Sequence, residues 1–372
     1  MIGPSHPRRR LAYDALIVGA LGLATAACSG SAVSTSPPTV VVPPGQDHAC
    51  VVAGSGRPPV AWAALANPVL HEPDAGVKDQ ALVWAGGRWH MLFSLVTDDA
   101  RLPGGVRWNV AVATSRDLRR WSAPVAWPAQ PGVIGVASPD IVRSPSGRFV
   151  ATYDSGPGET GGGQAKLYYR TSADLVHWSA ARPLGRGLAP GAGDRMIDPA
   201  LAWTGHGLVL GYKSGGPGAV QHFEIAWSRS GSLDGPWVSV GRPDISLYGD
   251  TVENFEFLTL GGRWHLVATS NTLDQPWMFS LVGNPTAPAS WLHWTAGAEF
   301  QIPAQTWDTG TGISSVGFEH ANSVFLCDAH ATGGYYYATY AGSDELTRFG
   351  GWGHAEIGIA RSTDLVHWQV PG

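Results

Sequence analysis

The sequence is poor in charge, in cysteine and in long regular apolar stretches. Charged residues make up 14% of the 372 residues and the formal net charge is −5, so the basic patches that nucleic-acid binders use are absent. No long segment repeats apolar residues at the helical period of about 3.6. These absences argue against a nucleic-acid partner and against a fold built from long helices.

Glycine, proline and tryptophan are abundant instead. The chain holds 49 glycines, 28 prolines and 17 tryptophans. Frequent turns between short segments rich in aromatic and β-branched residues are typical of all-β proteins. We therefore expect an all-β fold.

The N-terminal segment, residues 1–27, has the features of an export signal. Three arginines at 8–10 precede an apolar run at 16–27 that is short for a membrane span. The run leads into Cys28, and Ala26-Ala27-Cys28 resembles the lipobox of bacterial lipoproteins, in which the cysteine is lipidated. Ordinary signal cleavage nearby is the alternative. We expect an exported protein, either held at the outer face of the membrane through Cys28 or secreted.

A tether and a folded domain are expected after the signal. Residues 28–49 are rich in serine, threonine and proline and offer little to a core, so we expect a flexible tether before a folded domain at 50–372. Two further cysteines, Cys50 and Cys327, form an even pair, which in an exported protein favours a disulfide. That bond would join the start of the domain to its last repeat. Two free thiols are the alternative.

Five segments share one pattern: a polar residue, a short apolar run, a turn, and a second run rich in aromatic and β-branched residues. The clearest is ENFEFLTLGGRWHLVATS at 253–270, and DQALVWAGGRWHMLFS at 79–94 has the same GGRWH turn. Each segment is expected to form a β-hairpin. The five segments begin at Asp79, Asp140, Asp198, Glu253 and His320.

A second motif closes each repeat: a turn with Ser or Asp and Leu, followed by Trp. It ends at Trp121, Trp178, Trp237, Trp294 and Trp368. Both markers recur roughly every 60 residues, which favours β-propeller blades. We predict a five-bladed β-propeller in which each blade is a four-stranded antiparallel sheet beside a central channel. These tryptophans, and the histidines beside three of them (His177, His293 and His367), are expected to be structural.

The acids that open the hairpins are the candidates for chemistry. If the first strand of each hairpin lines the channel, Asp79, Asp140, Asp198 and Glu253 meet at one mouth. Carboxylates in one cleft raise one another's pKa values, which separates a protonated acid from an ionised base, as glycosidic hydrolysis requires. A ring of acids that holds a cation or a basic partner is the alternative.

Three of these acids, with their surroundings, resemble the three-carboxylate pattern of glycoside hydrolase family 43. The matching features are Asp79 with its hairpin, Asp198-Pro199 after Ile197, and Glu253, in the family's blade order. The resemblance covers about residues 60–370 and implies a five-bladed propeller that hydrolyses arabinose- or xylose-containing glycosides. It implies that Asp79 is the general base, that Asp198 orients and tunes the acid, and that Glu253 is the general acid.

The resemblance also implies roles for two other positions. Asp140 matches an acid that often opens blade two, a candidate for substrate contact. His320 matches a channel histidine that contacts a bound ion or its water; no cofactor is required, and calcium or sodium in the channel would fit the family. The chain departs from the family pattern at Gln80, where proline is usual, at Asn254-Phe255, where Gly-Pro is usual, and at Ala321.

An inverting mechanism is expected from the same resemblance. Asp79 and Glu253 should then lie about 6.5–9.5 Å apart, which leaves room for a water. Glu256 and Asp250 are rival acids near Glu253, which fits the family motif best.

Three further side chains are candidates to line a sugar pocket. Trp108, Trp203 and Lys213 are chosen by position, because sugar faces stack on aromatic rings. For each tryptophan a place in the core is the preferred interpretation.

Other functions stay open. A fructan-cleaving propeller hydrolase, which retains configuration, typically shows Asn-Asp-Pro in blade one and Arg-Asp-Pro in blade three; this chain has Lys78-Asp79-Gln80 and Ile197-Asp198-Pro199. A non-catalytic carbohydrate-binding lipoprotein would suit the departures from the family pattern, and a purely structural propeller ranks third. The expected partner is an oligo- or polysaccharide, and the expected state is a monomer.

Overall fold

The computed structural model describes most of the chain from Val60 onward. The described residues are 60–156, 158, 160, 163–188, 195–215, 221–245, 252–270, 275–295, 297–308, 319–326 (backbone only), 335–343, 349 and 356–372. The predicted signal and tether, the lipidation site Cys28 and the pair Cys50 and Cys327 lie outside the described residues. They remain predictions.

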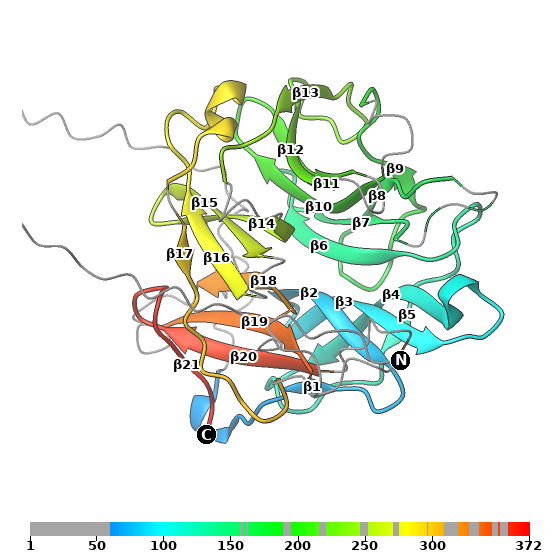
Figure 1. Ribbon diagram of the computed structural model, residues 1–372, viewed down its shortest axis with the longest axis vertical. Coiled ribbons are helices and arrows are strands. Elements are labelled where there is room, and N and C mark those ends of the chain that lie inside the picture. The colour runs from blue at the N-terminus through cyan, green and yellow to red at the C-terminus, as the bar shows by residue number, and fades with distance from the viewer. Residues whose placement is uncertain are drawn as a thin grey trace, which may run out of the picture. The chain divides into compact units, whose positions relative to one another are not determined.

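The described strands form five antiparallel sheets that follow one another in sequence (Figure 1). Blade one comprises β2 (Gly76–Ala85), β3 (Arg88–Asp98), β4 (Val106–Ser115) and β5 (Val125–Ala126). Blade two comprises β6 (Ala137–Arg143), β7 (Phe149–Asp154), β8 (Leu167–Ser172) and β9 (Arg182–Pro183). Blade three comprises β10 (Met196–Trp203), β11 (Leu208–Ser214), β12 (His222–Ser228) and β13 (Val238–Gly241). Blade four comprises β14 (Val252–Leu260), β15 (Arg263–Ser270), β16 (Gln275–Ser280) and β17 (Ala298–Glu299).

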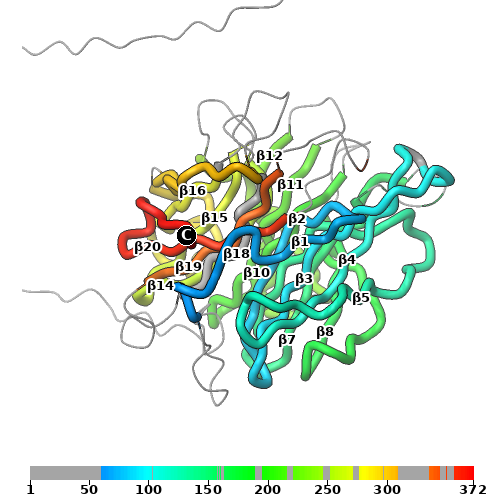
Figure 2. Tube along the Cα trace, turned by 90° about the horizontal axis from the view of Figure 1, so that it is seen from below, coloured from blue at the N-terminus to red at the C-terminus, as the bar shows by residue number. Residues whose placement is uncertain are grey.

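The last blade is completed by both ends of the described chain. It comprises β18 (Glu319–Leu326), β19 (Tyr336–Gly342) and β20 (Glu356–Ser362), with β1 (Leu70–His71) and β21 (Trp368–Gln369) both paired to β20. The blue and red ends of the described chain accordingly meet in one sheet (Figure 2). The first strands of neighbouring blades touch in the cyclic order β2, β6, β10, β14, β18 and back to β2. The predicted five-bladed β-propeller is confirmed.

The hairpins form where the sequence predicts them. The Gly-Gly turns of blades one and four have positive φ at both residues, 57° and 76° at Gly86 and Gly87 and 57° and 78° at Gly261 and Gly262. Such turns match the right-handed twist of the flanking strands, and glycine adopts them without steric cost.

The apolar core lies between the blades. Five clusters of buried side chains each join two neighbouring blades, so both faces of a blade are covered. Strand β7, for example, is buried at every residue, which explains why its sequence does not alternate between apolar and polar. Each cluster holds one of the predicted structural tryptophans: Trp121, Trp294, Trp368, Trp237 and Trp178.

The described residues include three short 3₁₀ turns: η1 (Trp62–Ala64), η2 (Pro103–Gly105) and η3 (Pro288–Leu292). In the described part of the chain, no helix has the length and apolar character needed to cross a bilayer.

Candidate active site

The first strands of blades one to four begin with the same backbone irregularity. In the first four blades the pairing with the second strand shifts at a β-bulge, and one residue of the bulge has a positive φ of 51–54°. Outside glycine this conformation is uncommon, and Asn and Asp adopt it most readily. The four residues are Asp79, Ser138, Asp198 and Asn254.

This equivalence corrects the sequence-based alignment of blade two. The residue that corresponds to Asp79 and Asp198 is Ser138, and Asp140 lies two positions further along its strand. Asp140 is buried, accepts a 2.8 Å hydrogen bond from the Ile141 N–H, and does not line the cavity described below. Burial raises the pKa of Asp140 to about 7. The structure therefore does not place Asp140 where a substrate would touch it.

Three of the four predicted acids meet in one cavity of about 330 Å³ at this end of the blades. Asp79 of blade one, Asp198 of blade three and Glu253 of blade four all line it, and so does the predicted pocket residue Trp108. The three acids lie on first strands of their blades, and these first strands contact one another in a ring around the channel. Residues more than 100 positions apart are thus brought into one polar cleft, as the hairpin pattern predicts.

The second strands add a further set of side chains at the same level. Ser94, Asp154, Lys213 and Thr269 each pair with the residue just before the positive-φ position of their own blade. Ser94 Oγ accepts a hydrogen bond of 2.8 Å from the N–H of Ser138 in the next blade. Asp154 Oδ2 accepts one of 2.9 Å from the N–H of Asp198, again in the next blade. The bulge N–H of one blade is thus satisfied by the preceding blade.

Blade three departs from this pattern, because Lys213 has no acceptor to offer. The Asn254 N–H instead points to Asp198 Oδ2 at 3.5 Å. Lys213 Nζ forms an ion pair with Glu253 Oε2, and the Lys213 side chain is almost fully buried. The predicted pocket residue Lys213 therefore acts on the predicted general acid directly.

The carboxylates of the cavity influence one another's protonation. Burial raises the pKa of Asp198, the negative charge of Glu253 raises it further, and the positive charge of Lys213 opposes both. Burial also raises the pKa of Asp154 well above its usual range, and the charge of Asp198 adds to this. The cavity therefore favours retention of a proton among its acids.

A second lysine lies at the blade-one side of the cavity. Lys78 Nζ is 3.9 Å from Asp79 Oδ1 and 5.9 Å from the centre of the Trp108 ring, and both Lys78 and Asp79 are buried. Trp108 thus presents a ring at the cavity wall next to a charged pair.

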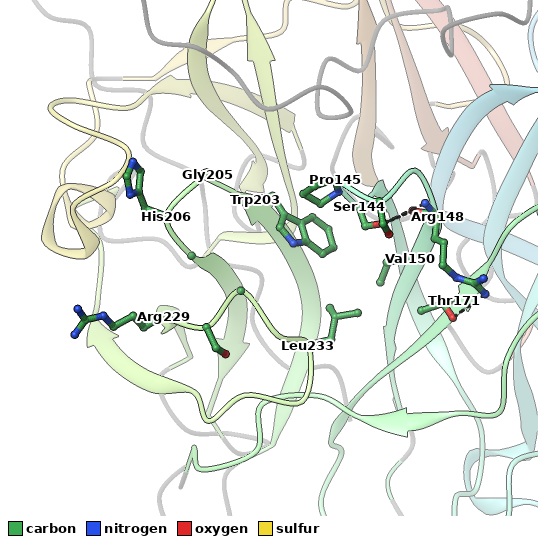
Figure 3. A pocket seen from close by; sticks show the side chains of 14 residues that line it. Ser144, Pro145, Arg148, Val150, Thr171, Trp203, Gly205, His206, Arg229 and Leu233 are labelled. Atoms are coloured by element: carbon green, nitrogen blue, oxygen red, sulfur yellow. Dashed lines mark hydrogen bonds between the residues drawn. The ribbon is translucent and has the colours of Figure 1, made fainter.

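The remaining predicted site residues fall elsewhere. Trp203 is buried at the far end of β10 and lines a separate pocket between the turns of blades two and three (Figure 3), so its place in the core explains it better. The rival acid Glu256 is buried and does not line the cavity, and the other rival, Asp250, lies outside the described residues. His320 lies in β18, but its side chain is not among those described.

The cavity residues that sequence reasoning did not assign to the site include Ser138, Asp154 and Arg195. Asp154 had a readable signal, because only blade two has an acid at the middle position of the tripeptides at the hairpin ends (YDS, against FSL, YKS and ATS). Arg195 precedes its strand and has no counterpart in the other repeats, so no pattern marked it.

Neither a protein-family model nor a curated protein matches this sequence. Solved structures do match the fold. A glycosyl hydrolase from Bacteroides ovatus is 12% identical, with a TM-score of 0.57 over 87% of this chain and 99% of that one. An α-L-arabinofuranosidase from Podospora anserina is 14% identical, with a TM-score of 0.55 over 82% and 96%. A family 43 endo-arabinanase from Bacillus licheniformis is 13% identical, with a TM-score of 0.50 over 78% and 95%.

These structures share the architecture expected from the sequence. The fold of this chain is similar to that of propeller glycoside hydrolases, including family 43. At identities this low the likeness establishes the fold, and the activity has to be argued from the residues of the cavity.

Proposed function

We propose that the protein is an exported glycoside hydrolase that cleaves arabinose- or xylose-containing glycosides with inversion of configuration. The observation that supports it most is the meeting of Asp79, Asp198 and Glu253, from three different blades, in one cavity with an aromatic wall. Hydrolysis by inversion needs two carboxyl groups on opposite sides of the glycosidic bond, one to activate water and one to protonate the leaving oxygen.

The burial of the three acids suits different roles. The Asp79 side chain is only 3% exposed, deep enough to hold a single water against the sugar and to take its proton. The Glu253 side chain is 21% exposed, which places it toward the opening, where a leaving group departs to solvent. Asp198 is buried, and its Oδ2 faces the N–H of Asn254, the residue that follows the proposed general acid.

The proposed reaction then uses only these side chains and water. Asp79 removes a proton from a water molecule as that water attacks the anomeric carbon. Glu253 gives its proton to the glycosidic oxygen as that bond breaks, and Asp198 adjusts the charge around Glu253. The expected separation of about 6.5–9.5 Å between Asp79 and Glu253 belongs to this proposal.

The experiment is to incubate the purified protein with arabinan, arabinoxylan, xylan and nitrophenyl arabinofuranoside or xyloside, and to follow the anomeric protons by NMR. The proposal predicts release of sugar of inverted configuration, abolished in Glu253→Gln. Retained configuration would contradict the mechanism, and turnover of fructans alone would contradict the substrate class.

A non-catalytic carbohydrate binder is the second candidate, favoured by one observation. The ion pair between Lys213 and Glu253 holds the proposed acid in contact with a positive charge, which favours the carboxylate over the protonated form that catalysis needs. Binding of a sugar in the cavity without turnover of any of the glycosides above would support this candidate.

Export and lipidation are proposed from the sequence alone. If Cys28 is lipidated, mass spectrometry of the membrane fraction will find the acyl chains on it, and Cys28→Ser will release the protein into the medium. A calcium or sodium ion in the channel is proposed from the His320 match. Among the described residues no group of three potential metal ligands was found, so any such site would need side chains beyond them.

A further inference from the structure

One acid of the cavity has no part in the mechanism above. Asp154, the last residue of β7, is 1% exposed and lines the cavity beside Asp79 and Asp198. Its Oδ2 accepts the N–H of Asp198 at 2.9 Å, while its Oδ1 is buried without a hydrogen-bond partner. A buried polar atom left unpaired is costly, and native proteins keep few of them.

The fold does not require the second oxygen of this side chain. At the equivalent place in blade one, Ser94 satisfies the bulge N–H of Ser138 with a single hydroxyl. A serine at position 154 would satisfy the Asp198 N–H in the same manner. The unpaired Oδ1 is therefore surplus to the connection between the blades.

A glycine of the cavity wall lies beside this oxygen. Gly156 also lines the cavity, and a Cβ at that position would lie 3.3 Å from Asp154 Oδ1 and 3.0 Å from the Cβ of Ala137. The φ of Gly156 is not in the left-handed region, so its backbone does not demand glycine. Any side chain at position 156 would therefore crowd Oδ1, which already has almost no exposed surface.

A matching donor lies on the same wall. Arg195 lines the cavity, and its Nε is buried without a hydrogen-bond partner. Asp154 lines the same cavity, and the positive charge of Arg195 acts to lower the pKa of its carboxyl. The wall thus offers one carboxyl oxygen and one guanidinium N–H, both unfilled, next to Asp79 and Asp198.

We propose that Asp154 Oδ1 and Arg195 Nε hydrogen-bond neighbouring hydroxyl groups of the sugar ring that sits between Asp79 and Glu253. This inference rests on the proposed function and extends it to substrate recognition. A carboxyl oxygen and an N–H together suit a pair of adjacent hydroxyls, which both donate and accept. The ligand class is a neutral glycosyl unit, because a uronate would bring its own carboxylate beside Asp79, Asp154 and Asp198.

Asp154 and Arg195 would discriminate against sugars that lack one of the contacted hydroxyl groups. A sugar that lacks one of the contacted hydroxyls would leave a buried polar group unpaired, and sites of this kind reject deoxy analogues strongly. Asp154 and Arg195 are therefore specificity-determining residues, separate from the acids that move protons.

The test measures sugar binding in the Asp79→Asn background, where turnover is suppressed. Xylotriose, arabinotriose and monodeoxy methyl xylosides and arabinofuranosides are titrated by calorimetry into the parent, Asp154→Ser, Asp154→Asn and Gly156→Ala. Asp154→Ser keeps an acceptor for the Asp198 N–H, and Gly156→Ala obstructs Oδ1 while leaving the carboxyl in place. Asp140→Asn, in the same blade but away from the cavity, is the control. The melting temperature is recorded for each variant.

The expected result is binding about tenfold weaker or more in Asp154→Ser and Gly156→Ala, with an unchanged melting temperature in Asp154→Ser, and with sugar binding by Asp140→Asn like that of the parent. For the deoxy analogue that lacks the contacted hydroxyl, the parent and Asp154→Ser should bind with equal affinity. Parent-like binding of every sugar by Asp154→Ser and Asp154→Asn would overturn this inference and leave the proposed function standing. Failure of the parent to bind any sugar would overturn both.

Discussion

The two ends of the blades differ in what they repeat: side chains at the turn end, and only backbone conformation at the cavity end. At the turn end the residues repeat: Asp174 and Asp364 each accept backbone N–H groups of the two residues that follow the next leucine, and each lies 2.8 or 2.7 Å from a histidine Nδ1. At the cavity end only the backbone repeats. The same bulge and the same positive φ present Asp, Ser, Asp and Asn in the first four blades.

This difference separates scaffold from function. A turn that is built by its own side chains must repeat those side chains, because the hydrogen bonds are local. A bulge that is held by the neighbouring blade can present any residue that tolerates the conformation. Variation at a repeated backbone position is therefore the better guide to the active site, and repetition of residues is the better guide to the frame.

The largest expected effect comes from exchanging residues at the equivalent bulge positions. Asp79→Asn should lower kcat by about a thousandfold or more, because the proposed base is lost while Asn tolerates the positive φ. Ser138→Asn places the same residue at the same backbone position of blade two and should lower kcat by less than about tenfold. Steady-state kinetics on the best substrate compares the two, and equal losses would show that the two positions have equal roles.

Lys213→Met should have the next largest effect, a loss of kcat/KM on the order of tenfold to a hundredfold near the pH optimum of the wild type. Lys213 lowers the pKa of Asp198, so its removal raises that pKa. If Asp198 must be ionised, the acid limb of the pH–rate profile moves to higher pH. Lys166→Met, at an exposed position outside the cavity, is the control. An acid limb that stays in place would contradict the assigned role of Lys213.

Asp140→Asn should change stability with pH and leave kcat unchanged. Its pKa rises from 3.8 to about 7 on folding, so between about pH 4 and 7 the unfolded chain gives up a proton that the folded protein retains. Rising pH therefore destabilises the wild type relative to the variant, by on the order of 4 kcal/mol at most. Urea denaturation of both proteins at pH 4, 5.5 and 7 measures the difference, and parallel pH dependences would contradict it.

The smallest effect on activity is expected at the turn end. Asp174→Ala removes the acceptor for the N–H groups of Val176 and His177 and should lower the melting temperature by a few degrees. It should leave kcat and KM unchanged, because the turn lies at the other end of the blade. A variant that melts normally but loses activity would reverse the division between frame and site.

The sequence alone was enough to predict the five blades. Of the four acids that it marked at the hairpin openings, three line the cavity. The hairpin and Trp markers are local patterns, and the glycine turns follow from backbone sterics. Asp140 was misplaced because it is the acid nearest the start of its hairpin, whereas the bulge of β6 puts Ser138, two residues earlier, at the position equivalent to Asp79 and Asp198. Trp203 lies in the core, the interpretation preferred for it from the sequence, because it ends β10 on the side opposite to Asp198.

Asp154 and Arg195 are cavity residues that the sequence could not assign to the site. What sets them apart is an unpaired atom in a cavity, and such a feature depends on the packing of two neighbouring blades. No single repeat contains that information. The sequence marks Asp154 as the odd residue among hairpin ends, but only the assembled blades show that one of its oxygens is left over.

The most direct test of the division between the two ends is the structure of Asp79→Asn with xylotriose or arabinotriose bound. The account predicts a sugar ring in the cavity between positions 79 and 253, with the glycosidic oxygen within hydrogen-bonding distance of Glu253. A sugar bound instead at the pocket beside Trp203, between the turns of blades two and three (Figure 3), with the cavity empty, would contradict it.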